Sequence, residues 1–95
     1  MPQPGAPLTA PTHLSAAPGA GAGQIALRWQ PIKGAEGYQI QQAIGMREPA
    51  TWHPAGVSTA AAFQATSLKS KTRYWFRVAA VGSDMWSRAA TLIAE

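Results

Sequence analysis

Apolar and polar residues alternate with a period of two along several short stretches of the chain. In the stretch 24–30, Ile25, Leu27 and Trp29 share one face of an extended chain, and the residues between them share the other. The stretch 73–81 repeats this pattern over more residues. Its predicted inward side chains are Tyr74, Phe76, Val78 and Ala80. A period of two is typical of strands with one buried face, so both stretches are predicted to belong to β-sheets.

Segments rich in Pro and Gly divide the rest of the chain into similar short stretches. These turn segments are expected at 18–23, 45–49 and 82–85. The predicted strands are 12–17, 24–30, 38–43, 52–57, 61–65, 73–81 and 86–94. The last stretch is Ala-rich and has helical propensity, but a seven-stranded sandwich needs it as a strand. The spacing therefore predicts an all-β sandwich of seven antiparallel strands.

A Pro-rich segment precedes the first predicted strand. Four prolines and Gly5 within residues 1–11 fix the backbone and remove hydrogen-bond donors. This segment is predicted to be an extended arm, and residues 12–95 are predicted to form the domain. The arm is either a mobile terminus, an interdomain linker, or a segment that lies on a neighbouring subunit. We expect contact with another subunit, anchored by Leu8, which is the arm's one large side chain apart from Met1.

Residues 11–94 resemble the fibronectin type III family through features that occur in the family's order. They are Pro11 with Leu14; Ile25, Leu27 and Trp29 before Pro31; Gly34–Tyr38 before Ile40; Leu68 with Tyr74; Phe76–Val78 with Ala80; and Trp86–Ser87. The spacing of Leu68 and Tyr74 resembles the family's tyrosine corner, in which the tyrosine hydroxyl bonds to backbone of the preceding loop. The resemblance implies an immunoglobulin-like sandwich and a Tyr74 hydroxyl that donates to a buried acceptor near residues 68–71.

The sequence departs from the family's pattern at two places. The family often has Pro two residues after the leucine of the corner, where this chain has Ser70. The turn between the last two predicted strands contains no Arg-Gly-Asp, so the resemblance does not support integrin binding of that kind. Because this fold carries many unrelated functions, the resemblance does not identify a ligand.

The composition fits one globular domain without covalent or metal cross-links. The chain has 95 residues, of which 46% are hydrophobic, and no cysteine, which excludes disulfides and thiolate chemistry. The formal net charge is +4, but the Lys and Arg residues are scattered and only 69–73 is dense, so nucleic-acid binding is not expected. The sequence has no signal-peptide pattern and no apolar run near the about 20 residues that span a bilayer, so membrane insertion is not expected.

Candidate residues for catalysis or metal binding are sparse. Neither His13 nor His53 has a carboxylate or a second histidine at ligand spacing. No pair of acidic residues can be placed together, and the Gly-rich run 19–23 lacks the lysine and helix of a phosphate-binding loop. The sequence therefore predicts no enzyme activity, no cofactor and no metal site.

Aromatic and basic residues indicate a candidate interaction face. Trp75 points away from Tyr74, so it is expected on the outer face of its sheet. The expected members of this face are Gln39, Gln41, Trp52, Arg73, Trp75, Arg77 and Trp86. One interpretation is a structural ladder in which guanidinium groups stack on indoles, with Trp86 covering Arg77. The other is a binding surface for a partner, and the two are compatible. Trp52 is either a lid on the core edge or an exposed anchor for a protein or a sugar ring.

These features predict a non-catalytic protein-interaction or structural module. The leading hypothesis is a surface or decoration component of a larger assembly such as a phage virion, located on the virion or outside the cell. The alternative is a spacer or accessory module of a secreted bacterial adhesin or carbohydrate-active enzyme. Expected partners are proteins or assembly subunits, with a cell-surface glycan as the alternative ligand.

Overall fold

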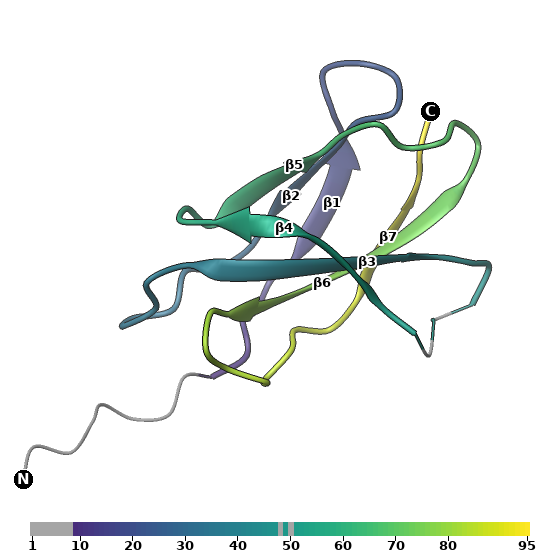
Figure 1. Cartoon of the computed structure of the whole chain (residues 1–95). Helices are drawn as coiled ribbons and strands as arrows, with labels where there is room; N and C mark the ends of the chain where they lie inside the picture. Colours follow the sequence, from purple (N-terminus) through teal and green to yellow (C-terminus); the bar gives the residue numbers. More distant parts are fainter. Residues whose placement is uncertain (1–8, 48, 50) are drawn as a thin grey trace, which may run out of the picture.

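The computed structural model describes residues 9–47, 49 and 51–95, and these residues form two antiparallel β-sheets packed face to face (Figure 1). The strands are β1 (Ser15–Pro18), β2 (Ile25–Arg28), β3 (Tyr38–Ile44), β4 (His53–Ser58), β5 (Ala62–Ala65), β6 (Arg73–Ala80) and β7 (Ala90–Ile93). One sheet has the order β1-β2-β5 and the other has the order β4-β3-β6-β7. The predicted seven-stranded antiparallel sandwich is confirmed.

The core lies between the two sheets and consists of the alternating apolar residues that the sequence pattern predicts to point inward. Its buried members are Ile25, Leu27, Trp29, Tyr38, Ile40, Ala65, Tyr74, Phe76, Val78 and Ala94. Trp29 and Tyr38 meet edge to face, with their ring centroids 5.3 Å apart. Leu14, Ala16 and Phe63 pack against this core, as their positions in the pattern predict. The alternation therefore identifies the buried face of each sheet correctly.

The first strand differs from its predicted range, 12–17. It begins at Ser15 and includes Pro18, which was expected in the following loop. His13 has a φ of 59°, in the left-handed region, so the chain is not extended there and the strand starts later. Pro18 is tolerated because β1 is an edge strand of its sheet and Pro18 is its last residue, where the missing N–H donor costs no ladder bond.

The last strand is shorter than the predicted 86–94, because Trp86–Ala89 and Ala94 are not part of it. Ser87 pairs with Val78 there through one backbone bond, from its N–H to the Val78 carbonyl at 2.8 Å, and one bond to its side chain. The backbone N–H of Val78 donates to Ser87 Oγ at 3.0 Å, and Ser87 Oγ donates to the carbonyl of Arg88 at 3.0 Å. The Ser87 side chain occupies the position of a ladder acceptor, so regular pairing with β6 resumes only at Ala90. The ends of β2, β3, β4, β5 and β6 differ from the predictions by one or two residues.

The arm predicted at 1–11 reaches the domain at its last residue. Pro11 is buried and lies beside a cleft formed with Ser87–Ala89. The carbonyl of Thr12 then accepts a hydrogen bond from the backbone N–H of Gln30 at 2.8 Å. The expected anchor Leu8 lies outside the described residues.

Two tyrosine hydroxyls hold loops against the sandwich. The Tyr74 hydroxyl accepts a hydrogen bond from the backbone N–H of Lys69 at 2.8 Å, so the contact lies in the predicted loop but the predicted direction, with the hydroxyl as donor, is wrong. The Tyr38 hydroxyl makes an equivalent bond, accepting from the backbone N–H of Ile32 at 2.8 Å. The sequence pattern predicted Tyr38 only as a core residue.

Replacing Tyr74 with Phe is expected to lower the free energy of unfolding by about 1–2 kcal/mol, because the partly buried N–H of Lys69 loses its acceptor. Urea unfolding of the variant and the unmodified protein measures the difference. Hydrogen exchange at the Lys69 amide should accelerate in the same variant. Equal stability together with unchanged exchange at Lys69 would show that the corner does not hold the β5–β6 loop.

Candidate functional site

The outer face of the four-stranded sheet carries the candidate interaction residues. In the register of β3 with β6, Gln41 is opposite Arg77 and Ala43 is opposite Trp75. Residues directly opposite each other point to the same side of a sheet, so these positions share the face turned away from the core. The seven predicted members of the face are all half-buried: Gln39, Gln41, Trp52, Arg73, Trp75, Arg77 and Trp86. The structure therefore brings the seven residues onto one surface.

Arg77 lies between two indole rings at the centre of this face. Its guanidinium carbon is 4.4 Å from the ring centroid of Trp86 and 4.7 Å from that of Trp52. Both distances are within the range of cation–π attraction. Trp86 comes from the β6–β7 connection and Trp52 immediately precedes β4, so the Trp86–Arg77–Trp52 stack joins three separate segments.

A β-bulge places Trp52 on the outer face. The register of β3 with β4 shifts between Ile40, which is opposite Gly56, and Gln41, which is opposite Pro54. The extra residue, Ala55, reverses the alternation along β4, so Pro54 and Trp52 face outward. Trp52 is therefore not a lid on the core, which was one of the two roles that the sequence left open, and its role as an anchor for a partner stays a prediction. It is one wall of the stack.

Hydrogen bonds fix the polar groups of the face to the chain itself. Arg77 Nε donates to Gln41 Oε1 at 2.8 Å, and Trp75 Nε1 donates to the carbonyl of Gly45 at 2.7 Å. Gln39 Nε2 donates to the carbonyl of Ser83 at 2.9 Å, and Arg73 Nη1 donates to Thr91 Oγ1 at 3.3 Å. A partner would meet side chains that are already ordered.

The stack covers small apolar residues on the outer side of the sheet. Ala79 is opposite Gln39 and is fully buried, and Ala43 is opposite Trp75 and is 5% exposed. Outward-facing alanines of a sheet are buried only when larger side chains lie over them. The tryptophans and Arg77 therefore form a second, thin apolar layer on the side of the sheet opposite the core.

Burial lowers the pKa of Arg77 from its usual value. The cause is loss of water around the guanidinium, and no carboxylate in the described ranges pairs with it. An arginine side chain nevertheless stays protonated at any physiological pH. The stack therefore has a permanent positive charge, held by π-faces and Gln41 rather than by an ion pair.

The position of Trp86 depends on Ser87, which sequence reasoning did not single out as a functional residue. Ser87 is 8% exposed, and its backbone N–H and side-chain oxygen both bond to Val78, the residue after Arg77. These two bonds hold the neighbouring Trp86 beside Arg77. The only signal in the sequence was the Trp-Ser pair after the turn.

The outer face of the other sheet has a different character. Small or polar residues cover it: Ser15, Ala17, Ala26, Arg28, Ala62 and Gln64. Large aromatic residues point outward only from the four-stranded sheet, among the residues that the structure describes. The two outer faces therefore differ in what they offer a partner.

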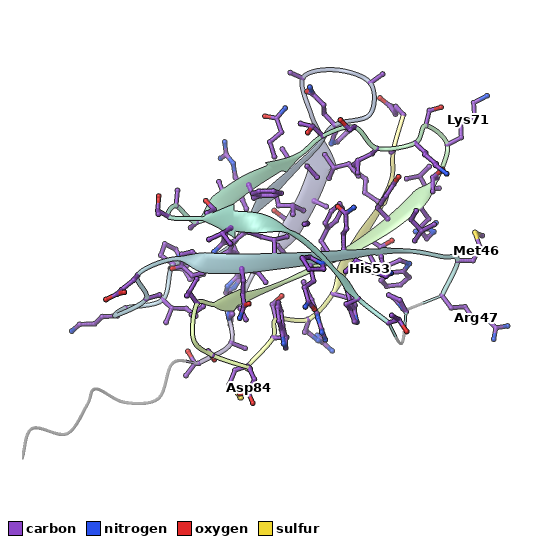
Figure 2. The ribbon with its side chains drawn as sticks, in the orientation of Figure 1. Met46, Arg47, His53, Lys71 and Asp84 are labelled. Carbon is purple, nitrogen blue, oxygen red and sulfur yellow. The ribbon has the colours of Figure 1, made fainter. Side chains whose placement is uncertain are left out.

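Groups that could support catalysis or metal binding do not converge. His13 and His53 are both exposed, and the described segments contain no cluster of three His, Asp or Glu side chains. Figure 2 shows His53 on β4, apart from the acidic Asp84 in the β6–β7 turn. No helix long and apolar enough to cross a bilayer occurs in the described residues.

Comparison with known proteins gives matches among solved structures only. No family model and no curated protein matches this chain. A Fn3-like protein from Clostridium thermocellum superposes with a TM-score of 0.76 and 22% identity, covering 92% of this chain and 93% of that one. The protein called FN3tt superposes with a TM-score of 0.72 and 22% identity, covering 90% of this chain and 92% of the other.

The FN1–FN3 domains of chicken CNTN1 are also similar to this chain. The match has a TM-score of 0.74 and 27% identity, and it covers 94% of this chain but 31% of the chicken chain, which contains several such domains. These likenesses agree with the two-sheet, all-β architecture of this chain. They establish the fold and leave the ligand open.

Proposed function

Because the chain is a fibronectin type III domain by fold, we propose that it is a non-catalytic interaction and structural module whose binding face is the outer surface of the four-stranded sheet. The observation that carries this proposal is the Trp86–Arg77–Trp52 stack with Trp75 beside it. Trp and Arg are enriched among the residues that contribute most to protein–protein binding. No other outer surface in the described part of the chain presents such a group.

The internal hydrogen bonds of the face favour binding. Ordering a long side chain at an interface costs about 0.5–1.5 kcal/mol. Arg77 and Trp75 are already held by Gln41 and Gly45, so this cost is largely met when the domain folds. The stack is therefore both a structural ladder and a rigid platform for a partner.

The proposed setting is a larger assembly such as a phage virion, in which the domain is a surface or decoration component. The Pro-rich arm would dock on a neighbouring subunit through Leu8. Proline lowers the entropy lost when such a segment is held extended. In the alternative setting, the domain is a spacer or accessory module of a secreted adhesin or carbohydrate-active enzyme. The encoding reading frame separates the two settings, according to whether it stops after Glu95 or continues into a glycosidase or further repeats.

A protein ligand suits the face better than a glycan. Sugar rings stack on the flat faces of exposed indoles, and Trp52 and Trp86 each already have one face against Arg77. A surface with a fixed positive charge and partly exposed indoles fits a protein surface with acidic and apolar groups.

Site-specific photo-crosslinking tests the binding face. Pro54 is exposed on the same outer face as Gln41, its neighbour across the β3–β4 pair. A benzophenone amino acid at position 54 is expected to capture a partner in the native host. The matched control is the same amino acid at Gln64, exposed on the outer face of the other sheet. Mass spectrometry should identify the same partner protein from Pro54 in repeated experiments, and Trp52→Ala should abolish that adduct. Equal capture from both positions, or no capture from Pro54, would refute this face as the binding surface.

A further inference from the structure

The exposed large hydrophobic side chains of the described residues fall into two groups at opposite ends of the four-stranded sheet. They are Ile44, Met46, Val57, Val81, Met85 and Ile93. All six come from the strands of that sheet or from the connections between them. Isolated exposed apolar residues are normal on a protein surface, but their division between the two ends of one sheet needs an explanation.

Val57, Val81 and Met85 form the group at the end where β3 begins, here called the turn end. Val57 is opposite Gln39, the second residue of β3. The backbone N–H of Val81 bonds to the carbonyl of Gly37, just before β3, at 2.9 Å. Met85 lies in the β6–β7 turn, in which the carbonyl of Ser83 accepts from Gln39 at 2.9 Å.

Ile44, Met46 and Ile93 form the group at the end where β3 finishes, here called the loop end. Ile44 is the last residue of β3 and is opposite Tyr74. Ile93 is opposite Arg73, whose carbonyl accepts from the N–H of Gly45 at 3.3 Å. Met46 follows Gly45 and is 82% exposed, the most exposed of the six residues.

The two ends also carry opposite charges beside their methionines. Asp84 precedes Met85 at the turn end, and Arg47 follows Met46 at the loop end, and both charged side chains are exposed. Figure 2 shows Asp84 at one extremity of the molecule and Met46 with Arg47 at another. A methionine next to an acidic residue at one end therefore matches a methionine next to a basic residue at the other.

We propose that copies of this chain associate end to end, with the turn end of one copy against the loop end of the next. Met85 would pack with Met46, and Asp84 would pair with Arg47. The interface joins unlike surfaces, so each copy keeps one free end after pairing, and the association grows into a linear row or closes into a ring. The proposal goes beyond the binding face above, because its central contacts, Met85 with Met46 and Asp84 with Arg47, come from the connections at the two ends of the sheet.

A second copy is the occupant that the charges favour. Asp84 at the turn end and Arg47 at the loop end have opposite charges, and both residues are present on every copy. The contact is small, at the low end of specific interfaces, so association is expected to be weak and visible only at high protein concentration. In a larger assembly that raises the local concentration, such a contact becomes effective.

Sedimentation equilibrium of the purified chain tests the association. The average mass should rise with concentration up to about 1 mM, the scale of weak contacts, and should pass the mass of a dimer without levelling there. A chain that stays monomeric at that concentration, or an association that stops at the dimer, would overturn the proposal.

Charge reversal tests the pairing itself. Asp84→Lys and Arg47→Glu should each weaken association about five- to tenfold, because each places like charges at the contact. A mixture of the two variants should recover association, since their altered ends are complementary and their unaltered ends are too. Arg28→Glu, on the other sheet, makes the same change in net charge as Arg47→Glu and should have little effect. Association that is unchanged by both charge reversals would exclude this contact. A mixture that associates no more strongly than either variant alone would exclude it as well.

The proposed binding face and the proposed end-to-end association can be refuted independently of each other. Asp84→Lys and Arg47→Glu leave the Trp86–Arg77–Trp52 stack intact. The probe at position 54 should therefore still capture a partner protein other than this chain with unchanged yield. Trp52→Ala should remove that adduct and leave the sedimentation behaviour unchanged. A shared loss in both experiments would show that the captured partner is a second copy bound through the face, which contradicts the end-to-end arrangement.

Discussion

Gly23→Val is expected to lower the free energy of unfolding by about 3 kcal/mol or more, a large share of the stability of a domain of this size. Gly23 has a φ of 74°, in the left-handed region that branched residues avoid. A Cβ atom at this position would lie 2.9 Å from the backbone carbonyl oxygen of Leu68. Because that neighbour is backbone, the side chain cannot be accommodated by a rotamer change.

The position of Gly23 makes this conformation costly to abandon. Its N–H donates to the carbonyl of Glu95 at 2.9 Å, and its carbonyl accepts from the N–H of Leu68 at 3.0 Å. These bonds join the β1–β2 loop, the β5–β6 loop and the C-terminal segment, which meet at the top of the molecule in Figure 1. A shift of the backbone at Gly23 would break this three-way contact.

Gly21→Val is the matched control for Gly23→Val. Gly21 lies in the same loop, is exposed, and its added Cβ would approach nothing closer than Gln24 Oε1 at 3.8 Å. Its substitution should change stability by about 0.5 kcal/mol or less. Chemical unfolding monitored by tryptophan fluorescence measures both variants. A similar effect at the two positions would mean that loss of glycine flexibility in the loop, rather than the geometry of Gly23, sets the cost.

Arg77→Ala is expected to lower the free energy of unfolding by about 2–3 kcal/mol, although its site lies outside the main core. The change removes a cation from between two indole rings, a contact worth about 0.5–2 kcal/mol on each side. It also removes the charged donor of Gln41 Oε1. The space left between Trp52 and Trp86 would admit water over the buried Ala43 and Ala79.

Arg77→Lys separates the charge of Arg77 from its shape. Lysine keeps the positive charge but lacks the flat guanidinium that lies between two rings, so it should recover only part of the lost stability. Arg73→Ala is the control on the same face, because Arg73 has one long hydrogen bond to Thr91 and no indole above it. Thermal and urea unfolding measure the three variants. If Arg77→Ala were no more harmful than Arg73→Ala, the stack would contribute nothing to folding.

The proposed binding role of the stack is compatible with a contribution of the same residues to stability. Its residues are half-buried, so each contributes apolar contact to the sheet below and keeps surface for a partner. Arg77→Lys is informative for this reason, because a small loss of stability with a large loss of partner capture would assign the guanidinium to recognition. The reverse result would assign it to folding.

The alternation of apolar and polar residues was enough to predict the sandwich and the two sides of each sheet. The alternation in residues 24–30 and 73–81 placed Trp29 and Phe76 inside and Trp75 and Arg77 outside, and the structure confirms each position. This success has a simple cause. Successive side chains of a strand point to opposite faces, so a clear apolar pattern leaves one register compatible with a buried core.

Which outward-facing residues contact one another could not be predicted from the alternation and depends on the folded structure. Trp52 joined the stack because the bulge at Ala55 reverses the alternation along β4, and nothing in the local sequence marks that extra residue. Ser87 ended regular pairing because its hydroxyl lies within reach of Val78, nine residues earlier. The direction of the Tyr74 bond likewise depended on which backbone group the β5–β6 loop presents to the hydroxyl. Each outcome rests on contacts between distant segments, whose geometry is fixed when the strands pair and not by the period of the chain.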